Sequence, residues 1–97
     1  MKIYLTGPMS NNPNYELEFQ HVEDLLHEKG HIVINPVNLV SEDCTVWEDA
    51  MKADLVEMLR CDAVAVVHTC QPSKGQALEI LIANQLDIPC KDYQEYL

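Results

Sequence analysis

The sequence predicts an α/β fold, a small doubly wound parallel sheet of four or five strands flanked by helices. Short apolar runs, which predict strands, alternate along the chain with longer amphipathic runs, which predict helices. The connections are short, as in parallel sheets built from right-handed crossovers. The glycines Gly7, Gly30 and Gly75 all fall at predicted element boundaries. Together these features are typical of Rossmann-like and flavodoxin-like sheets.

The first third of the chain predicts a strand, a helix and a second strand. Residues 2–6 and 31–34 are the strands, and residues 13–29 are the helix between them. Asn12 is the expected N-cap, with a proline in the first turn, and Gly30 is the expected stop. The apolar stripe expected to face the sheet is Tyr15, Phe19, Val22, Leu25 and Leu26.

The remaining elements continue the alternation. A capping box, Thr45 to Glu48, opens a helix that is expected to end near residue 60. A buried strand over residues 63–67 and a helix ending near residue 86 follow, then a candidate fourth strand at residues 88–90 and a tail with room for a helical turn. Trp47 is either core or a lid for a ring-shaped ligand. The buried stripe expected on the helix of residues 45–60 is Trp47, Met51, Leu55, Met58 and Leu59.

Length and charge narrow the class of protein. Ninety-seven residues predict a single domain, over residues 1–97. The formal net charge of −10 argues against nucleic-acid polymers and anionic membranes as partners, because both require basic patches. No apolar stretch is long enough to span a bilayer, and the start lacks the layout of a signal peptide. A small anionic molecule remains a possible ligand.

Cysteine and histidine spacing argues against a metal site. The four cysteines, at positions 44, 61, 70 and 90, form no C-x-x-C pair, and the histidines do not fall at ligand spacing. Reduced thiols in a cytoplasmic protein are therefore expected. We expect no metal ion and no cofactor.

The most informative stretch is a strand-turn-helix unit at residues 63–86. Ser73 and Gln76 fit a capping box, so the turn ends at a helix N-terminus, which favours anions. Glu79 is the only charged residue between Gly75 and Leu86. In doubly wound sheets, ligands bind beyond the carboxyl ends of the strands where strand order reverses. We therefore expect the turn of residues 69–75 to face the turn Gly7-Pro8-Met9-Ser10 across a crevice.

Each candidate residue also has a purely structural interpretation. Glu79 would be a solvated carboxylate near the helix dipole, and Ser73 would only cap the helix. Lys74 would be a surface lysine, Asp54 the edge of an apolar stripe, and Tyr4 a core side chain. Known nucleotide motifs do not decide the matter, since neither G-x-G-x-x-G nor a phosphate-loop lysine motif is present.

Four segments, taken together, resemble a known family. They are Ile3-Tyr-Leu-Thr-Gly-Pro-Met-Ser10, Asp54-Leu55, Cys61-Asp-Ala-Val-Ala-Val66 and Gln71-Pro-Ser-Lys-Gly-Gln-Ala-Leu-Glu79. They are similar to segments of the nucleoside 2-deoxyribosyltransferase superfamily. The resemblance is closest to its 2′-deoxynucleoside 5′-monophosphate N-glycosidase branch and to short phage-type relatives. It covers most of the chain in order.

The resemblance implies roles for four side chains. Glu79 matches the nucleophile that attacks the anomeric carbon, and Asp54 matches the acid that assists departure of the base. Tyr4 matches the tyrosine beside the nucleophile. Ser73 matches the serine that binds the 5′-phosphate, where nucleoside-using transferases carry an aspartate, so a nucleotide is the favoured substrate.

Further substrate contacts are expected around this set. Gly7 and Gly75 would keep backbone amides close to the ligand, Pro8 and Met9 would line the opening turn, and Lys74 would add a positive charge near the phosphate.

The expected function is cleavage of the N-glycosidic bond of a 2′-deoxynucleoside 5′-monophosphate, or exchange of its base, through a carboxylate nucleophile. The chain ends at Leu97, and its opening loop lacks an arginine for the phosphate. A non-catalytic nucleotide-binding or sensor module on the same fold is therefore the alternative, and a structural protein without a ligand is a third reading. We expect a small-molecule nucleotide or nucleoside partner, and a homodimer or higher homo-oligomer, with residues 45–60 as the candidate dimer surface.

Overall fold

The computed structural model describes residues 1–8, 13–38, 46–67 and 73–97. Its helices and strands follow the expected alternation. In chain order they are β1 (Lys2–Thr6), α1 (Tyr15–Glu28), β2 (Ile32–Ile34), α2 (Trp47–Leu59), β3 (Ala63–Val66), α3 (Lys74–Gln85) and β4 (Cys90–Asp92). Short 3-10 helices occupy Pro36–Asn38 and Tyr93–Tyr96. Among these described residues no helix is both long and apolar enough to cross a bilayer.

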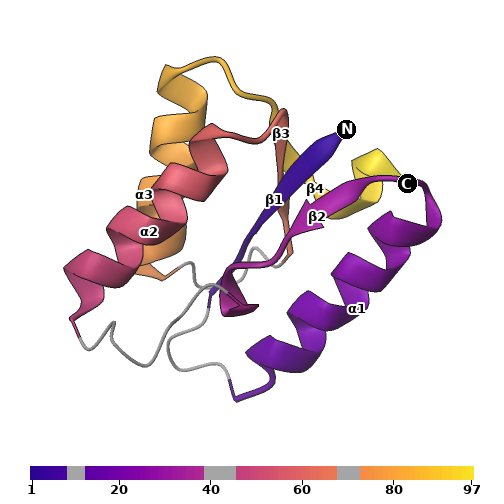
Figure 1. Ribbon diagram of the computed structural model, residues 1–97, viewed down its shortest axis with the longest axis horizontal. Helices are drawn as coiled ribbons and strands as arrows, with labels where there is room; N and C mark the ends of the chain where they lie inside the picture. The colour runs from indigo at the N-terminus through magenta and orange to yellow at the C-terminus, as the bar shows by residue number, and fades with distance from the viewer. Residues whose placement is uncertain (9–12, 39–45, 68–72) are drawn as a thin grey trace.

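The four strands form one parallel sheet in the order β2-β1-β3-β4. β1 lies in the middle, where Tyr4 is paired with Ile34 on one side and Val64 on the other. β2 lies on one side of β1, whereas β3 and then β4 lie on the other side (Figure 1). Strand order therefore reverses between β1 and β3, which confirms the predicted α/β fold and the strands expected to flank the crevice.

The helices cover the sheet in two layers. Figure 1 shows α2 and α3 side by side on one face and α1 on the other. Because side chains alternate along a strand, β1 serves both layers. Ile3 and Leu5 pack in a core cluster with Phe19 of α1, whereas Tyr4 packs in a second cluster with Met58 of α2.

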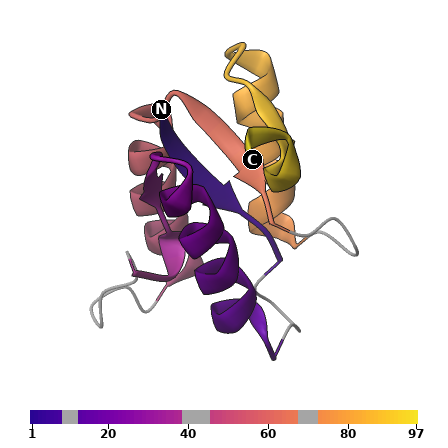
Figure 2. The ribbon, with the colours of Figure 1, turned by 90° about the vertical axis from the view of Figure 1, so that its right-hand side faces the viewer.

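The two ends of the chain lie close together at the amino edge of the sheet. Both views of the ribbon place the N- and C-termini near one another (Figures 1 and 2). The His31 ring lies between them, 3.4 Å from the Met1 amine through Nδ1 and 3.2 Å from the Tyr96 carbonyl oxygen through Nε2. The opposite, carboxyl edge of the sheet therefore lies away from the termini.

α1 follows the prediction in its buried face and differs at its start. Phe19, Val22 and Leu26 are buried. The helix begins at Tyr15 with Asn14 as its N-cap, two residues later than expected, because residues 13 and 14 form a turn. The predicted cap, Asn12, lies outside the described residues. The expected stop is confirmed, since Gly30 has a φ of 85°, a conformation that glycine adopts readily.

α2 departs further from the prediction. It begins at Trp47 with Val46 as its N-cap and no side-chain cap bond, so the predicted capping box does not open it. Thr45 itself lies outside the described residues. Met51 and Met58 are buried as expected, but Trp47 is 40% exposed and Leu59 is 50% exposed. The buried face is narrower than predicted because α2 packs beside α3, and Leu59 points about 100° away from Met58 around the helix axis.

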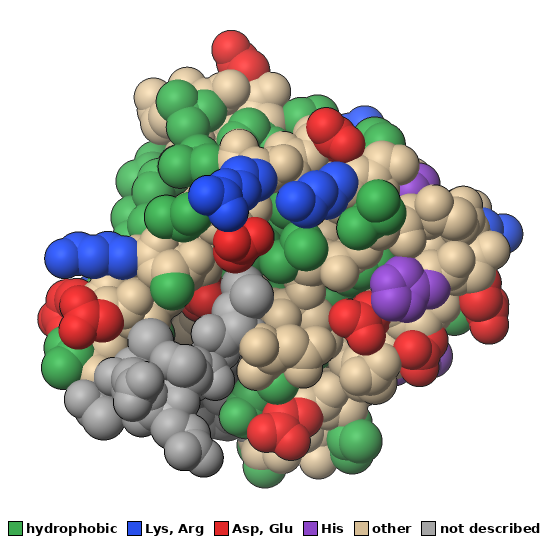
Figure 3. Space-filling view, viewed as in Figure 1, with side chains coloured by type: hydrophobic (Ala, Val, Ile, Leu, Met, Phe, Trp, Pro, Cys, Tyr) green, Lys and Arg blue, Asp and Glu red, His purple; other side chains and the backbone are tan. Residues whose placement is uncertain are grey.

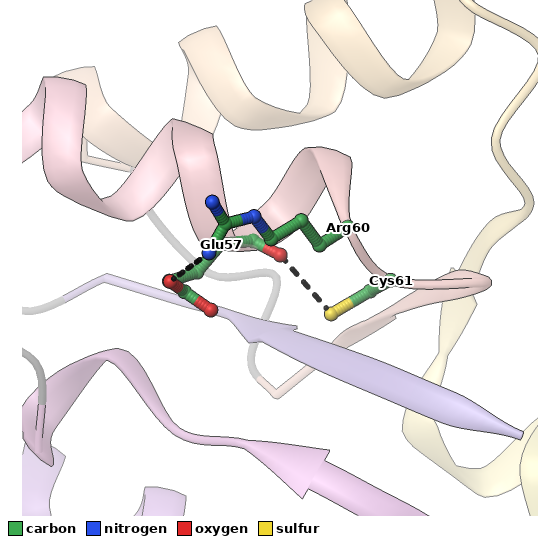
Figure 4. Close-up of polar contacts among 3 residues, drawn as sticks. All are labelled: Glu57, Arg60 and Cys61. Carbon is green, nitrogen blue, oxygen red and sulfur yellow. Dashed lines mark hydrogen bonds and ion pairs between the residues drawn. The ribbon is translucent and has the colours of Figure 1, made fainter.

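The end of α2 is fixed by its own side chains and backbone. Figure 4 shows Arg60 in an ion pair with Glu57 at 3.2 Å and the Cys61 thiol donating to the Glu57 carbonyl oxygen at 3.3 Å. Burial raises the pKa of Cys61 to about 11, so the thiol stays protonated at neutral pH. Cys61 and Cys90 are free, and the other two cysteines lie outside the described residues.

β4 begins two residues later than the candidate strand, at Cys90, because proline lacks the N–H that a ladder needs. The Pro89 carbonyl still accepts from Val64 N at 2.7 Å. The tail then forms the helical turn considered in the sequence, as the 3-10 helix Tyr93–Tyr96. The Tyr96 hydroxyl donates to the Val64 carbonyl at 3.0 Å. This contact anchors the end of the chain to β3.

Candidate active site

Glu79 lies in the second turn of α3 with its carboxyl group turned toward β1. Only 6% of the residue is exposed. The Tyr4 hydroxyl donates to one carboxylate oxygen, Oε2, and the Thr6 hydroxyl donates to the other, Oε1, at 2.9 Å. The surface position considered for Glu79 in the sequence is therefore wrong. A buried carboxylate held by two donors from one strand is the central feature of this face.

The surroundings of Glu79 favour its neutral form. Burial raises the pKa of this carboxyl to about 7, against the opposing effect of the hydrogen bonds from Tyr4 and Thr6. Burial and the nearby Glu79 charge also raise the pKa of the Tyr4 phenol, so this hydroxyl remains a donor at any physiological pH. Near neutral pH, Glu79 can both hold and lose a proton.

Asp54 of α2 belongs to the same electrostatic cluster. The residue is partly buried, and burial raises the pKa of its carboxyl to about 6. Its charge in turn raises the pKa of both Glu79 and Tyr4. Asp54 and Glu79 lie on different helices, and their carboxyl groups interact electrostatically, while their pairing in catalysis stays a prediction.

The N-terminus of α3 has the predicted cap. Ser73 is the N-cap, and its hydroxyl accepts from Gln76 N at 3.2 Å. Lys74 does not extend freely into solvent, because its ammonium lies 4.2 Å from the centroid of the Trp47 ring. This cation–π contact joins the first residues of α2 and α3.

Gly75 leaves a gap between these side chains. A Cβ added at Gly75 would lie 4.0 Å from both Ser73 Oγ and Trp47 Nε1, and 3.4 Å from Met51 Sδ. These are ordinary contact distances, so the glycine is not required by the fold. The gap is bordered by two groups that are able to form hydrogen bonds, the Ser73 hydroxyl and the Trp47 indole N–H.

The opening turn is only partly described. Gly7 and Pro8 are buried, and Met9 lies outside the described residues. A Cβ at Gly7 would lie 3.0 Å from the Phe19 ring and 3.2 Å from Val67, closer than ordinary packing allows. Close packing against Phe19 and Val67 therefore favours a glycine at position 7. The ligand contact expected from the sequence would be a second reason for this glycine.

Thr6 is the residue that sequence reasoning missed. From the sequence alone it is only the end of the first strand and one member of a segment that resembles the family. A signal was present, because Thr6 lies two positions after Tyr4 and must share its side of the strand. A polar side chain there, at the carboxyl end of a buried central strand, points toward the helix that carries Glu79.

Two other features lie on the opposite face, around α1. An open pocket of about 260 Å³ is lined by Glu18, His21, Val22, Val67 and Tyr93. On α1 the ligand atoms of Glu23, Asp24 and His27 lie within 4.8 Å of one another. Exposed groups of this kind are common without an ion, so we assign this trio no metal. Neither feature includes Glu79 or Asp54.

Comparison with known proteins places this chain in a family. Residues 1–92 match the family model described as "Domain of unknown function (DUF4406)". The chain belongs to the DUF4406 family. No curated protein matches it.

A solved structure adds a likeness in three dimensions to this DUF4406 member. The chain is similar to a 2-deoxyribosyltransferase from the psychrotolerant bacterium Bacillus psychrosaccharolyticus, with a TM-score of 0.73 and 25% sequence identity. The alignment covers 93% of this chain and 69% of that one. That enzyme is described as a biocatalyst for the industrial synthesis of antiviral and antitumoral nucleosides. The likeness supports the nucleoside 2-deoxyribosyltransferase superfamily, which the sequence resembles.

Proposed function

We propose that this protein cleaves the N-glycosidic bond of a 2′-deoxynucleoside 5′-monophosphate, by hydrolysis or by exchange of the base. The observation that carries the proposal is the buried Glu79 carboxylate, held by Tyr4 and Thr6 beside the β1–β3 reversal point. The similarity to a 2-deoxyribosyltransferase supports deoxyribosyl transfer as the reaction class.

The reaction follows from the two carboxyl groups. A carboxylate oxygen of Glu79 forms a bond to the anomeric carbon, and the bond from that carbon to the base nitrogen breaks. The electron pair goes to the base, which takes a proton from Asp54. Water or a second base then attacks the glycosyl ester, giving up a proton to Asp54 and releasing the Glu79 carboxylate. Hydrolysis and base exchange differ only in this last nucleophile.

The protonation states set the pH range in which this division of roles is possible. Glu79 must be ionised and Asp54 protonated when the base departs. The pKa of Glu79 is raised to about 7 and that of Asp54 to about 6, so the two carboxyls exchange protons in the same pH range. The required state holds one proton on the pair, and that proton is on Asp54. Because Glu79 has the higher pKa, this is the less populated of the two one-proton forms, and its population is largest between these values. Activity should therefore peak at about pH 6–7 and fall on both sides.

The phosphate group of the substrate would lie at the N-terminus of α3. Ser73 and Lys74 supply a hydroxyl and an ammonium beside a helix N-terminus, and Gly75 adds no side chain there. The net charge of −10 opposes an anion, but beyond about 8–10 Å that repulsion is largely screened by salt. Charge-assisted hydrogen bonds at contact distance contribute about 1.5–3 kcal/mol each, so the local attraction should dominate.

Release of free base tests the proposal directly. Concentrated protein is incubated at pH 6.5 with a panel of 2′-deoxynucleoside 5′-monophosphates and the matching nucleosides, and the products are separated by chromatography. We expect free base and 2-deoxyribose 5-phosphate from at least one nucleotide. Binding of a nucleotide without release of any base would instead favour the sensor module, and no binding at all would favour a structural protein.

We also propose that the protein forms a homodimer, through a surface that includes part of the expected helix α2 and extends onto α3. Met51 is only 6% exposed and cannot serve as a contact. Hydrophobic side chains instead gather over α2 and α3 (Figure 3), where Val56, Leu59, Leu81 and Leu86 are each about half exposed. Light scattering at micromolar concentration should give twice the mass of the chain. The Leu59→Lys variant should give the mass of a single chain. A monomer mass for the wild type would contradict the dimer.

A further inference from the structure

Thr6 is a buried hydroxyl whose described side-chain hydrogen bond goes to the proposed nucleophile. Its exposed fraction is 0%, and its Oγ1 donates to Glu79 Oε1 at 2.9 Å. The sequence resemblance assigned it no role. Valine has nearly the same shape and is as favourable in a strand, so packing alone does not require a hydroxyl at this position.

The backbone and side chain that carry this hydroxyl are held rigidly. Thr6 ends β1, the strand with neighbours on both sides, and its carbonyl accepts from Val67 N at 2.8 Å. A β-branched side chain on such a strand has a restricted χ1 angle. The direction of the hydroxyl oxygen is therefore set by the sheet and does not depend on the bound substrate.

One donor cannot fix a carboxylate as two donors can. The Tyr4 hydroxyl holds Oε2, which leaves the carboxyl plane free to rotate about that contact. The Thr6 hydroxyl holds Oε1 from the same strand, two residues further along, and removes this freedom. A carboxylate with both oxygens held keeps one fixed orientation, as an attack on a defined carbon atom requires.

We propose that Thr6 is a positioning residue for Glu79, one that sets the orientation of its carboxylate and favours its charged form. The proposal rests on the proposed function only in naming Glu79 as the nucleophile. Both effects follow from the same hydrogen bond, since a donor stabilises the charged carboxylate against the cost of burial. Asp54 acts in the opposite direction on Glu79, and Tyr4 in the same direction.

The test compares Thr6→Val, which removes the hydroxyl and keeps the shape, with Thr6→Ser, which keeps the hydroxyl. The carboxyl carbon of Glu79 is followed by carbon-13 NMR across pH 4–10, and its signal is assigned with Glu79→Gln. The wild-type carboxyl should titrate near 7, Thr6→Ser should titrate near the wild-type value, and Thr6→Val should titrate at about 8. Thermal unfolding of each variant shows that the folded protein was measured.

Kinetics provide the second readout. Thr6→Val should lower kcat at pH 7 by about fivefold, because the ionised fraction of Glu79 falls, while KM changes less than about twofold. The alkaline limb of its pH–rate profile, which follows the higher pKa of the pair, should move to higher pH, and Thr6→Ser should restore it. A purely structural role would lower the unfolding temperature and leave both pH profiles in place.

The outcomes separate the two proposals. An unchanged Glu79 titration in Thr6→Val would overturn the positioning role, even if base release proceeds. A raised pKa in Thr6→Val, in a protein that releases base from no substrate, would support the positioning of Glu79 by Thr6 and contradict the proposed reaction.

Discussion

The two faces of β1 are equally buried, but one packs against apolar side chains and the other forms hydrogen bonds to a carboxylate. Ile3 and Leu5 face α1 and pack among apolar side chains only. Tyr4 and Thr6 face α3 and direct their hydroxyls at one carboxylate. Since alternation along a strand separates the two sets, a single five-residue strand supplies core on one side and a polar site on the other. The comparison teaches that burial alone does not distinguish residues that stabilise the fold from residues that serve chemistry.

The apolar face should dominate stability. Leu5→Ala removes a fully buried side chain and should lower the free energy of unfolding by about 2–5 kcal/mol. The loss should be the same at pH 5 and pH 8, because no titrating group is affected. Tyr4→Phe is the matched variant from the other face, and its loss should grow with pH as Glu79 loses a donor and becomes charged. Urea unfolding at the two pH values measures both, and equal pH dependence for the two variants would break the distinction between the faces.

The polar face should reduce stability when its carboxyl is charged. Burial raises the pKa of Glu79 from 4.5 to about 7, so the folded state binds a proton more tightly than the unfolded state does. Stability should therefore be greatest below about pH 4.5 with respect to this group, and should fall as pH rises through 7. Glu79→Gln should remove the penalty and stabilise the protein at pH 8 by up to roughly 3 kcal/mol.

The same variant should have little effect at pH 4.5, where Glu79 is already neutral. Glu28→Gln, an exposed change at the end of α1, is the control and should follow the wild-type curve. A Glu79→Gln protein that is less stable than the wild type at pH 8 would mean that the charged carboxylate contributes favourably to the fold.

The smallest expected effect concerns the phosphate. Ser73→Ala should weaken binding of a 5′-monophosphate by about 1–2 kcal/mol and leave binding of the matching nucleoside nearly unchanged. Gly75→Ala provides a separate check, because it fits sterically and favours the helix, yet places a methyl group in the gap beside Ser73. The Gly75→Ala variant should have a higher unfolding temperature and should bind the nucleotide more weakly. Calorimetry with both ligands measures this, and equal losses for nucleotide and nucleoside would show that Ser73 only caps α3.

Much of the fold could be predicted because it depends on local patterns. The apolar runs located the strands, and Gly30 and Ser73 marked the end of α1 and the start of α3. The exposure of Trp47 and Leu59 could not be predicted, because it depends on how α2 packs beside α3. The sequence pattern of α2 is compatible with a wider buried face than the neighbouring helix allows.

The candidate site was predictable to a similar degree. Glu79 stood out as a lone charge among apolar residues, and Tyr4 and Asp54 came from the family resemblance. The second donor, Thr6, was not found, because the meaning of a threonine at a strand end depends on which helix its side faces. That information is tertiary, and it appears only when α3 is placed over β1.

The central claim is that Glu79 acts as a nucleophile, and a comparison of Glu79→Gln with the wild type tests it most directly. The release of free base from a 2′-deoxynucleoside 5′-monophosphate is measured at pH 6.5, with nucleotide binding measured in parallel. The account predicts that Glu79→Gln binds the nucleotide within about tenfold of the wild type and releases base at least about a thousandfold more slowly. Wild-type rates of base release in Glu79→Gln would contradict it.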